Sequence, residues 1–492
     1  MPISILRARN PGERREVNQQ CRRLRQVGTA MLDLALFGFF ALMLVLGLRH
    51  PFAWVLAYLY VDIVAPQKVA WGFMTSLPVS LLAFVAAFSG WLLIDRKEGA
   101  RFTFRQGLIA ALLVYCGLTT LSADFPVEAL DKWGWVWKAL VFAIFLPLTL
   151  TNRLRMESAI VFLVLALGTI VINAGIKTVA AGGGYGTLSL LVDDDSGLYE
   201  DSILACVAIA TIPLILWLSR FGTVFPPDWR VKLFTAALIF ACLMVPVGTE
   251  ARTGLLCIAV LGILMMRTVK NRALYLAGAA FVGLAAIPFL PQSFTERMST
   301  IENHSADQSA STRIAVWSWT LDYVKDHPFG GGFNAYLGNE LTFNTVEAET
   351  EGATTTITAK TITDKARAYH SSYFEMLGEQ GWPGLAIWLW LNLLGIWQME
   401  RIRRRWKDRV GESERWIAPL AVSLQQGLII YMVGSAFVGI AFQPFIFMLA
   451  GLQCALWSYC KIRDGQESRT NRAAGAGKSA TSPEPGNPAT AL

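Results

Sequence analysis

The 492-residue sequence contains little charge, only four histidines and no recognisable pattern of cysteines. Charged residues make up 16% of it, whereas soluble proteins average about 25%. The seven cysteines follow neither a zinc-ligand spacing nor the pattern of a disulfide framework. The glycine triplet at 182–184 lacks the GK[ST] sequence that completes a phosphate-binding loop. These absences give no support to a zinc protein, a disulfide scaffold or a nucleotide-binding domain.

Long apolar runs are instead the dominant feature, and hydrophobic residues make up 54% of the chain. A helix that crosses a bilayer needs about 20 predominantly apolar residues. Runs of this kind exclude a soluble multidomain enzyme and predict an all-α polytopic membrane protein. We expect about twelve transmembrane helices, at residues 30–48, 76–94, 107–122, 135–150, 157–180, 201–219, 231–247, 253–267, 272–290, 382–399, 416–436 and 440–460.

The basic residues predict how these helices are oriented. The apolar segment 52–65 is short for a span and is closed by Pro66. If it does not cross and the N-terminus is cytoplasmic, most of the 43 Lys and Arg residues lie inside, as the positive-inside rule requires. Segment 52–65 is then re-entrant or interfacial. The net charge of +7 is thereby explained as topology charge beside anionic lipid, without nucleic acid as a partner.

One polar segment on the predicted outer side, 291–381, is far longer than the other connections. Long loops are usually functional or disordered. Its first half has the apolar spacing of an amphipathic helix, at Ile314, Trp317 and Leu321. Residues 345–365 are rich in threonine and weakly patterned, and we interpret them as a mobile lid. The loop should therefore be partly helical.

Histidine is scarce enough to consider each one. His50 and His304 stand in contexts typical of interfacial and solvated residues, and His327 lies in the glycine-rich turn DHPFGGGFNAY, where a structural role is favoured. His370 instead begins HSSYFEMLGEQGWPG, which predicts a helix start at the membrane surface. Because imidazole titrates near neutral pH, His370 is a candidate for proton transfer, and a structural role stays open.

Two arginines on the outer side are candidate ligands of an anion. Arg252 lies in GTEARTGLL, where a span begins, and Arg313 opens the helix TRIAVWSWTLDYV. Charged groups at the membrane edge commonly mark binding sites, and two planar, bidentate guanidinium groups suit a diphosphate. The alternatives are an ion pair of Arg252 with Glu250 or a snorkelling side chain, and for Arg313 a solvated charge at a helix start. Asp193–Asp195 could bind a divalent cation through their carboxylate oxygens, although a short acidic run on an outer loop is more often solvated, and we predict neither a metal site nor a cofactor.

Three segments, in this order, resemble the O-antigen ligase and polymerase superfamily of bacterial envelope glycosyltransferases. They are EARTG around Arg252, TRIAVWSWTLDYVKDHPFGGGFNAY with the family's R–x3–W and HP–x–G–x–G spacings, and YHSSYFEMLGEQGWPG around His370. The resemblance covers residues 250–385, and Ser371 stands where many relatives carry Asn. The stretch RHPFAWVLAYLYVDIVAPQKVAWGF is also similar to the exosortase-associated O-glycosylation ligases.

The resemblance implies a GT-C-like glycosyltransferase of the bacterial inner membrane, and the positive-inside rule predicts that both termini are cytoplasmic. It implies that a glycan moves from undecaprenyl diphosphate to an acceptor hydroxyl, with inversion and without a metal or cofactor. The acceptor would be lipid A–core, another lipid-linked glycan or a protein. Carried over to this sequence, the site has His370 as general base, Arg252 and Arg313 as diphosphate ligands, and Glu250, His327, Tyr369 and Ser371 as supporting residues.

The expected organisation follows from the spans and loops. It comprises a basic cytoplasmic arm (1–29), transmembrane helices (30–290) with the segment at 52–65, a large periplasmic loop (291–381), C-terminal transmembrane helices (382–463) and a disordered cytoplasmic tail (464–492) rich in Gly, Ala, Ser and Pro. A ligase is the main hypothesis, with a polymerase of the same superfamily as the alternative. A transporter of lipid-linked sugars would need more polar residues deep in its spans, and a scaffold would leave Arg313 and His370 unexplained.

Overall fold

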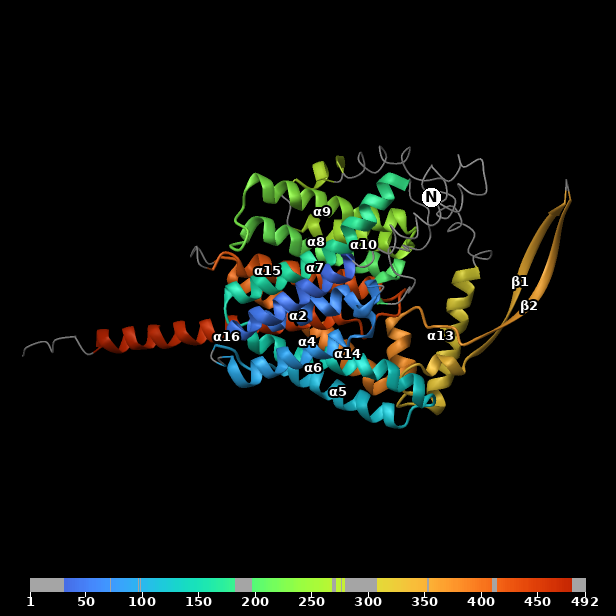
Figure 1. The fold of residues 1–492 in the computed structure, drawn as a ribbon, viewed down its shortest axis with the longest axis horizontal. Coiled ribbons are helices and arrows are strands. Elements are labelled where there is room, and N and C mark those ends of the chain that lie inside the picture. Colours follow the sequence, from blue (N-terminus) through green and yellow to red (C-terminus); the bar gives the residue numbers. More distant parts are fainter. Residues whose placement is uncertain are drawn as a thin grey trace, which may run out of the picture.

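The computed structural model describes residues 31–479, apart from 71, 96, 98, 182–196, 268–270, 276, 279–307, 352–353 and 409–413. Most of the described residues form a bundle of helices, from which a β-hairpin and the last helix project (Figure 1). By length and apolar composition, seven of the described helices could each cross a membrane. The predicted class, an all-α polytopic membrane protein, is confirmed, and the count of twelve spans stays a prediction.

The elements run through the whole described chain. The helices of the bundle are Met31–Arg49, α2 (Phe52–Val64), α4 (Val79–Ser89, continued by η3, Gly90–Ile94), α5 (Phe104–Leu121), α6 (Pro126–Thr149), α7 (Arg153–Ala181), α8 (Asp201–Phe221), α9 (Trp229–Gly248), α10 (Arg252–Met266), α14 (Ser372–Trp406), α15 (Ile417–Gly434) and α16 (Pro444–Ser479). The other elements are α3 (Pro66–Val69), η2 (Phe73–Ser76), η4 (Gly197–Tyr199), α13 (Gln308–Asp326), η6 (Ala335–Gly338), β1 (Glu340–Glu351) and β2 (Thr354–Lys365).

Helix α8 belongs to the centre of the bundle because of its composition. Its side chains are apolar on nearly every face, and most of them are buried. It packs against α9, α10 and α15. A helix that is apolar all round must be covered all round, so the sequence of α8 accounts for its position.

The two ends of the bundle are distinguished by the elements that meet there. At one end, here called the site end, α14 begins next to the end of α15, since the Ser372 N–H donates to the Ser435 carbonyl at 2.8 Å. The start of α8 lies at the same end, with the Cys206 thiol 3.9 Å from the Tyr431 carbonyl. Helix α16 leaves the bundle at the opposite end, here called the tail end (Figure 1).

Residues 52–65 differ from the sequence-based expectation. They form the largely buried helix α2, which lies antiparallel to Met31–Arg49, with Trp54 Nε1 donating to the Leu44 carbonyl at 2.8 Å. The Tyr199 hydroxyl donates to the Val64 carbonyl at 2.6 Å, so α2 ends at the site end. The first helix therefore begins there too.

This geometry corrects two predictions. Segment 52–65 is not interfacial or re-entrant, and the described chain starts at the site end but finishes at the tail end, so the two do not share the cytoplasmic side. The charge argument failed because it fixed the N-terminal arm in the cytoplasm, and because a helix of 13 residues is short for a span. Residues 1–29 themselves lie outside the described part.

The predicted disordered tail is also partly corrected, since α16 extends to Ser479. The first part of α16 is packed in the bundle, so the unfavourable nucleation of the helix has already taken place there. Each further residue then adds one hydrogen bond to an existing helix. Residues 464–479 contain enough Ala, Gln, Glu and Arg to continue it. Residues 480–492 lie outside the described part.

The threonine-rich segment interpreted as a mobile lid forms an antiparallel hairpin. Strands β1 and β2 pair from Glu340 opposite Lys365 to Glu351 opposite Thr354, and the hairpin projects away from the bundle (Figure 1). Thr, Ile and Val are β-branched and favour extended backbone. The threonine-rich sequence has no periodicity typical of a helix or of a buried strand, but its β-branched residues favour a two-stranded ribbon.

Candidate functional site

Helix α13 is fixed against the start of α14 by one tryptophan. The Trp317 ring stacks on Phe374 with centroids 4.9 Å apart and planes 4° apart. Trp317 Nε1 also donates to the Tyr369 carbonyl at 2.9 Å. Because residues four apart share one face of a helix, Arg313 lies on the face of α13 that carries Trp317. The R–x3–W spacing thus orients Arg313 towards the residues just before α14.

His370 lies just before α14, in a strained backbone conformation with φ of 47°. Non-glycine residues seldom adopt positive φ, and such strain collects at functional sites. Ser372, two positions later, anchors this segment, since its Oγ donates to the Val438 carbonyl at 2.9 Å and accepts from the Ile440 N–H at 2.8 Å. The backbone at His370 is therefore determined by α15 and the segment after it.

The surroundings of His370 favour a neutral imidazole. Two effects lower the pKa of His370 from its usual 6.5. The larger is the partial burial of the ring, and the second is the positive charge of Arg313 and Arg367. Each of these effects disfavours the imidazolium ion. At neutral pH the side chain is consequently in the form that can accept a proton.

Arg367 was not predicted from the sequence. Its backbone is held by the buried Asn339, whose Nδ2 donates to the Arg367 carbonyl at 2.7 Å and whose Oδ1 accepts from the Arg367 N–H at 2.9 Å. Its guanidinium is ion-paired with Asp364. The two residues before and after the hairpin are thereby joined, and this long-range contact leaves no local signal in the sequence.

Arg252 lies at the same end of the bundle, in the first turn of α10. One turn further on, the Cys257 thiol is 3.9 Å from the Ile430 carbonyl of α15, close to the point where α15 meets the start of α14. Glu250, in the turn before α10, is buried and has a φ of 54°, the second strained residue among the predicted ones. The structure thus brings Arg313 beside His370 and places Arg252 and Glu250 at the site end.

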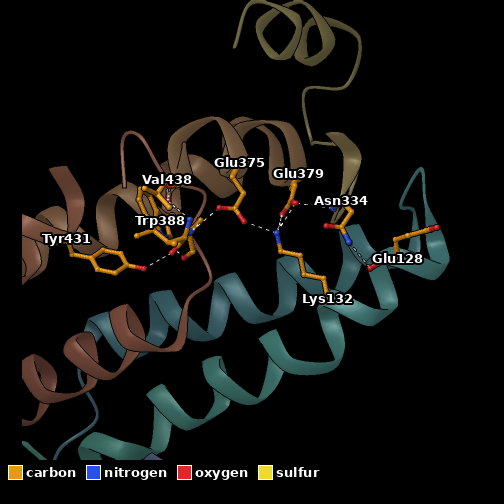
Figure 2. Close-up of polar contacts among 11 residues, drawn as sticks. Glu128, Lys132, Asn334, Glu375, Glu379, Trp388, Tyr431 and Val438 are labelled. Carbon is orange, nitrogen blue, oxygen red and sulfur yellow. Dashed lines mark hydrogen bonds and ion pairs between the residues drawn. The ribbon is translucent and has the colours of Figure 1, made fainter. Parts of the chain in front are cut away.

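The helix that follows His370 carries a buried charge network, shown in Figure 2. Lys132 Nζ of α6 donates to Glu375 Oε1 at 2.7 Å and to Glu379 Oε1 at 2.9 Å. The Ala441 N–H donates to Glu375 at 3.0 Å, and the Asn334 N–H donates to Glu379 at 3.0 Å. Burial raises the pKa of Glu379 and Lys132 opposes that rise. Four separate chain segments therefore meet at two carboxylates.

The glycine-rich turn docks on the kink of α14. Gly331 and Gly332 donate backbone hydrogen bonds to the carbonyls of Gly378 and Glu379, at 3.0 and 2.9 Å. Gly381 makes the kink, with φ of 61° and ψ of −168°, a conformation that glycine adopts without steric cost. The predicted glycine pattern is thus explained by close backbone contact.

Three predicted supporting residues have distinct environments. His327 is exposed and stacks on Tyr323 with ring centroids 4.3 Å apart, which fits a structural role in the turn. Tyr369 is buried, and its hydroxyl has no hydrogen-bond partner among the described residues. Ser371 is buried, and its carbonyl accepts from the Glu375 N–H in the first turn of α14.

Metal-binding groups are not gathered anywhere in the described residues, since no three His, Cys, Asp or Glu side chains come together there. Asp193–Asp195 lie outside the described part.

A helical bundle with apolar helices long enough to cross a membrane defines a polytopic membrane protein, and its candidate site lies at one end of that bundle. A family model described as O-Antigen ligase matches residues 236–389, which include Arg252, Arg313 and His370. Residues 236–389 are therefore similar to the O-antigen ligase domain, which supports the resemblance that the motifs predicted. Residues 31–223 match a family of unknown function (DUF5935), and no curated protein matches the chain. The exosortase-associated subgroup stays a prediction.

Proposed function

We propose that this protein is an inner-membrane glycan ligase that moves an oligo- or polysaccharide from undecaprenyl diphosphate to an acceptor hydroxyl. The O-antigen ligase domain supports ligase- or polymerase-type glycan transfer in general. The observation that carries the specific proposal is the half-buried, neutral His370 beside Arg313 and Arg367. A neutral base next to fixed cations suits a reaction in which a proton is taken up while an anion departs.

The proposed reaction assigns one role to each group. His370 takes the proton from the acceptor hydroxyl while its oxygen attacks the anomeric carbon with inversion. The bond from that carbon to the diphosphate oxygen breaks, and undecaprenyl diphosphate leaves with the additional negative charge. Arg252 and Arg313 bind the diphosphate, and Arg367 adds a third cation near the imidazole. Donors aimed at developing charge lower the barrier without a metal.

The orientation in the membrane follows from the basic residues. The helix ends and connections at the tail end carry clusters of arginine and lysine, among them Arg401–Lys407 at the end of α14. The positive-inside rule assigns this end to the cytoplasm. The site end, with α13 and the hairpin of the 291–381 loop, is then periplasmic, where lipid-linked glycans and their acceptors would meet.

His370→Ala and His370→Gln in the full-length protein test the proposal. Purified variants in proteoliposomes receive a defined undecaprenyl-diphosphate glycan, with lipid A–core, a second lipid-linked glycan or a peptide as acceptor. We expect a loss of transfer of about 10²–10⁴-fold, the usual contribution of a general base. His50→Ala is the matched control, because that imidazole is exposed and lies between the first helix and α2, at the tail end of the bundle.

The acceptor that is consumed separates a ligase from a polymerase. Extension of the second lipid-linked glycan alone would establish the polymerase. Full transfer by the His370 variants would refute the assignment of the base, and loss of transfer on chelation of divalent cations would refute the metal-independent reaction.

A further inference from the structure

A polar cavity lies at the tail end of the bundle, the end opposite His370. It has a volume of about 520 Å³ and is enclosed by the ends of α8, α10, α14 and α15. Five basic side chains line it, namely Arg220, Arg267, Arg403, Lys407 and Arg415, and its lining contains no carboxylate. Cations from four helices and their flanking turns therefore converge on one space.

Nearby carboxylates compensate only part of this charge. Glu400 pairs with Arg403 at 2.7 Å and lies 3.7 Å from Arg267. No described carboxylate lies within ion-pair distance of Arg220 or Arg415, both of which are exposed. Because like charges repel, a cluster of this kind is stabilised by an anion.

The inner part of the cavity is largely apolar, with Ser423 and Gln426 of α15 as its polar residues. Pro213, Leu216 and Val422 line its wall together with Trp217 and Trp406. Seven residues of helix separate Pro213 from Arg220, so the wall continues about 10 Å from the cationic mouth into the bundle. A small inorganic anion needs only the mouth. A cationic rim above an apolar wall, with tryptophans at the boundary, matches a phosphate headgroup followed by acyl chains.

We propose that this cavity binds an anionic glycerophospholipid, and that a lipid with two phosphate groups fits it best. The phosphates contact Arg220 and Arg415 at the mouth, and the first part of an acyl chain lies along α8 and α15. The same lipid touches the far ends of α10 and α14, the two helices that begin at Arg252 and after His370. This site is separate from glycan transfer and does not depend on it.

The test is lipid binding by the purified full-length protein in dodecylmaltoside, measured by native mass spectrometry. Cardiolipin, phosphatidylglycerol and phosphatidylcholine of matched chain length are compared, with sodium phosphate and pyrophosphate as free anions. The variant is Arg220→Gln/Arg415→Gln. The matched control, Arg230→Gln/Lys232→Gln, removes two charges from α9, which lines no part of this cavity.

We expect one tightly bound cardiolipin per chain, bound more tightly than phosphatidylglycerol. Two phosphate contacts are lost in the variant, which should bind cardiolipin about thirty-fold more weakly, while the control binds as the wild type does. Equal binding by the variant would overturn the proposal, as would an equal loss in the control. Displacement of cardiolipin by pyrophosphate at similar concentration would identify a free-anion site, and equal binding of phosphatidylcholine would identify unspecific lipid contact. Both results contradict an anionic-lipid site.

Discussion

Replacement of Lys132 by methionine removes the only cation that bonds Glu375 and Glu379 in the network of Figure 2. The side chains of the two glutamates are 9% and 0% exposed. Both carboxylates contact one nitrogen, so their nearest oxygens are less than about 6 Å apart, and two unit charges at that distance repel by about 3 kcal/mol at an effective dielectric constant of 20. Breaking a buried ion pair commonly costs about 3–5 kcal/mol. We therefore expect Lys132→Met to lower the free energy of unfolding by about 3–5 kcal/mol.

The assay is SDS-driven unfolding in dodecylmaltoside micelles, followed by tryptophan fluorescence. Lys325→Met is the matched control, because Lys325 and Asp322 form an exposed pair at 2.6 Å, and exposed pairs contribute about 0–1 kcal/mol. Lys132→Met combined with Glu375→Gln and Glu379→Gln should recover most of the loss, since the amide oxygens still accept the backbone hydrogen bonds. A loss no larger than that of Lys325→Met, or a triple variant as unstable as Lys132→Met, would refute this reasoning.

The pH dependence of this variant has a defined sign. Burial already raises the pKa of Glu379 in the folded protein, and removal of the ammonium group raises it further. A carboxyl group with a raised folded-state pKa stabilises the fold below its unfolded pKa and loses that contribution as pH rises. The deficit of Lys132→Met should accordingly be smallest near pH 5 and largest above pH 7. The same unfolding curves, recorded at several pH values, measure it.

Three further predictions concern the candidate site. The lowered pKa of His370 places the acidic limb of the pH profile of kcat/KM below pH 6.5. Arg367→Gln should move that limb to higher pH, because a cation near the imidazole is removed. An unchanged limb would show that Arg367 does not affect the pKa of His370. Gly381→Ala should destabilise the protein and abolish transfer, because a Cβ at φ 61° would collide with the docked turn. A wild-type melting temperature, or transfer at the wild-type rate, would contradict this. Trp317→Ala should reduce both transfer and stability, because it releases α13 from the start of α14. Trp317→Phe keeps the stacking and should retain most of both. Transfer by the alanine variant at the wild-type rate would show that Trp317 is not needed to position Arg313.

The sequence predicted best those features whose determinants are local. Arg313 and Trp317 are one helical turn apart, so their shared face could be inferred, and the helix start at His370 was evident from the residues that follow it. Lys132 and Glu375 are separated by 243 positions, and nothing near either residue indicates its partner. Arg367 is placed by Asn339 through backbone contacts, which composition and periodicity do not reveal.

The topology near the N-terminus shows a different limit. Helix α2 is short, and its sequence is compatible with a surface segment or with a buried helix. Its place is decided by contacts such as that between Tyr199 and Val64, which join segments 135 positions apart. The positive-inside rule is applied to the sum of all basic loops. One wrongly assigned helix therefore changes the predicted side of a terminus, although the remaining basic loops still lie on the cytoplasmic side.

The β-hairpin leaves and rejoins the loop at a single point, because Glu340 pairs with Lys365 and Asn339 binds the backbone of Arg367. Whatever its length, the ribbon therefore returns the chain to the same position before His370. Its tip is accordingly a place where the protein can be lengthened, shortened or tagged without altering the spacing of the groups at its base. An epitope or a fluorophore inserted there would report which side of the membrane the hairpin occupies, in an enzyme that is otherwise unchanged.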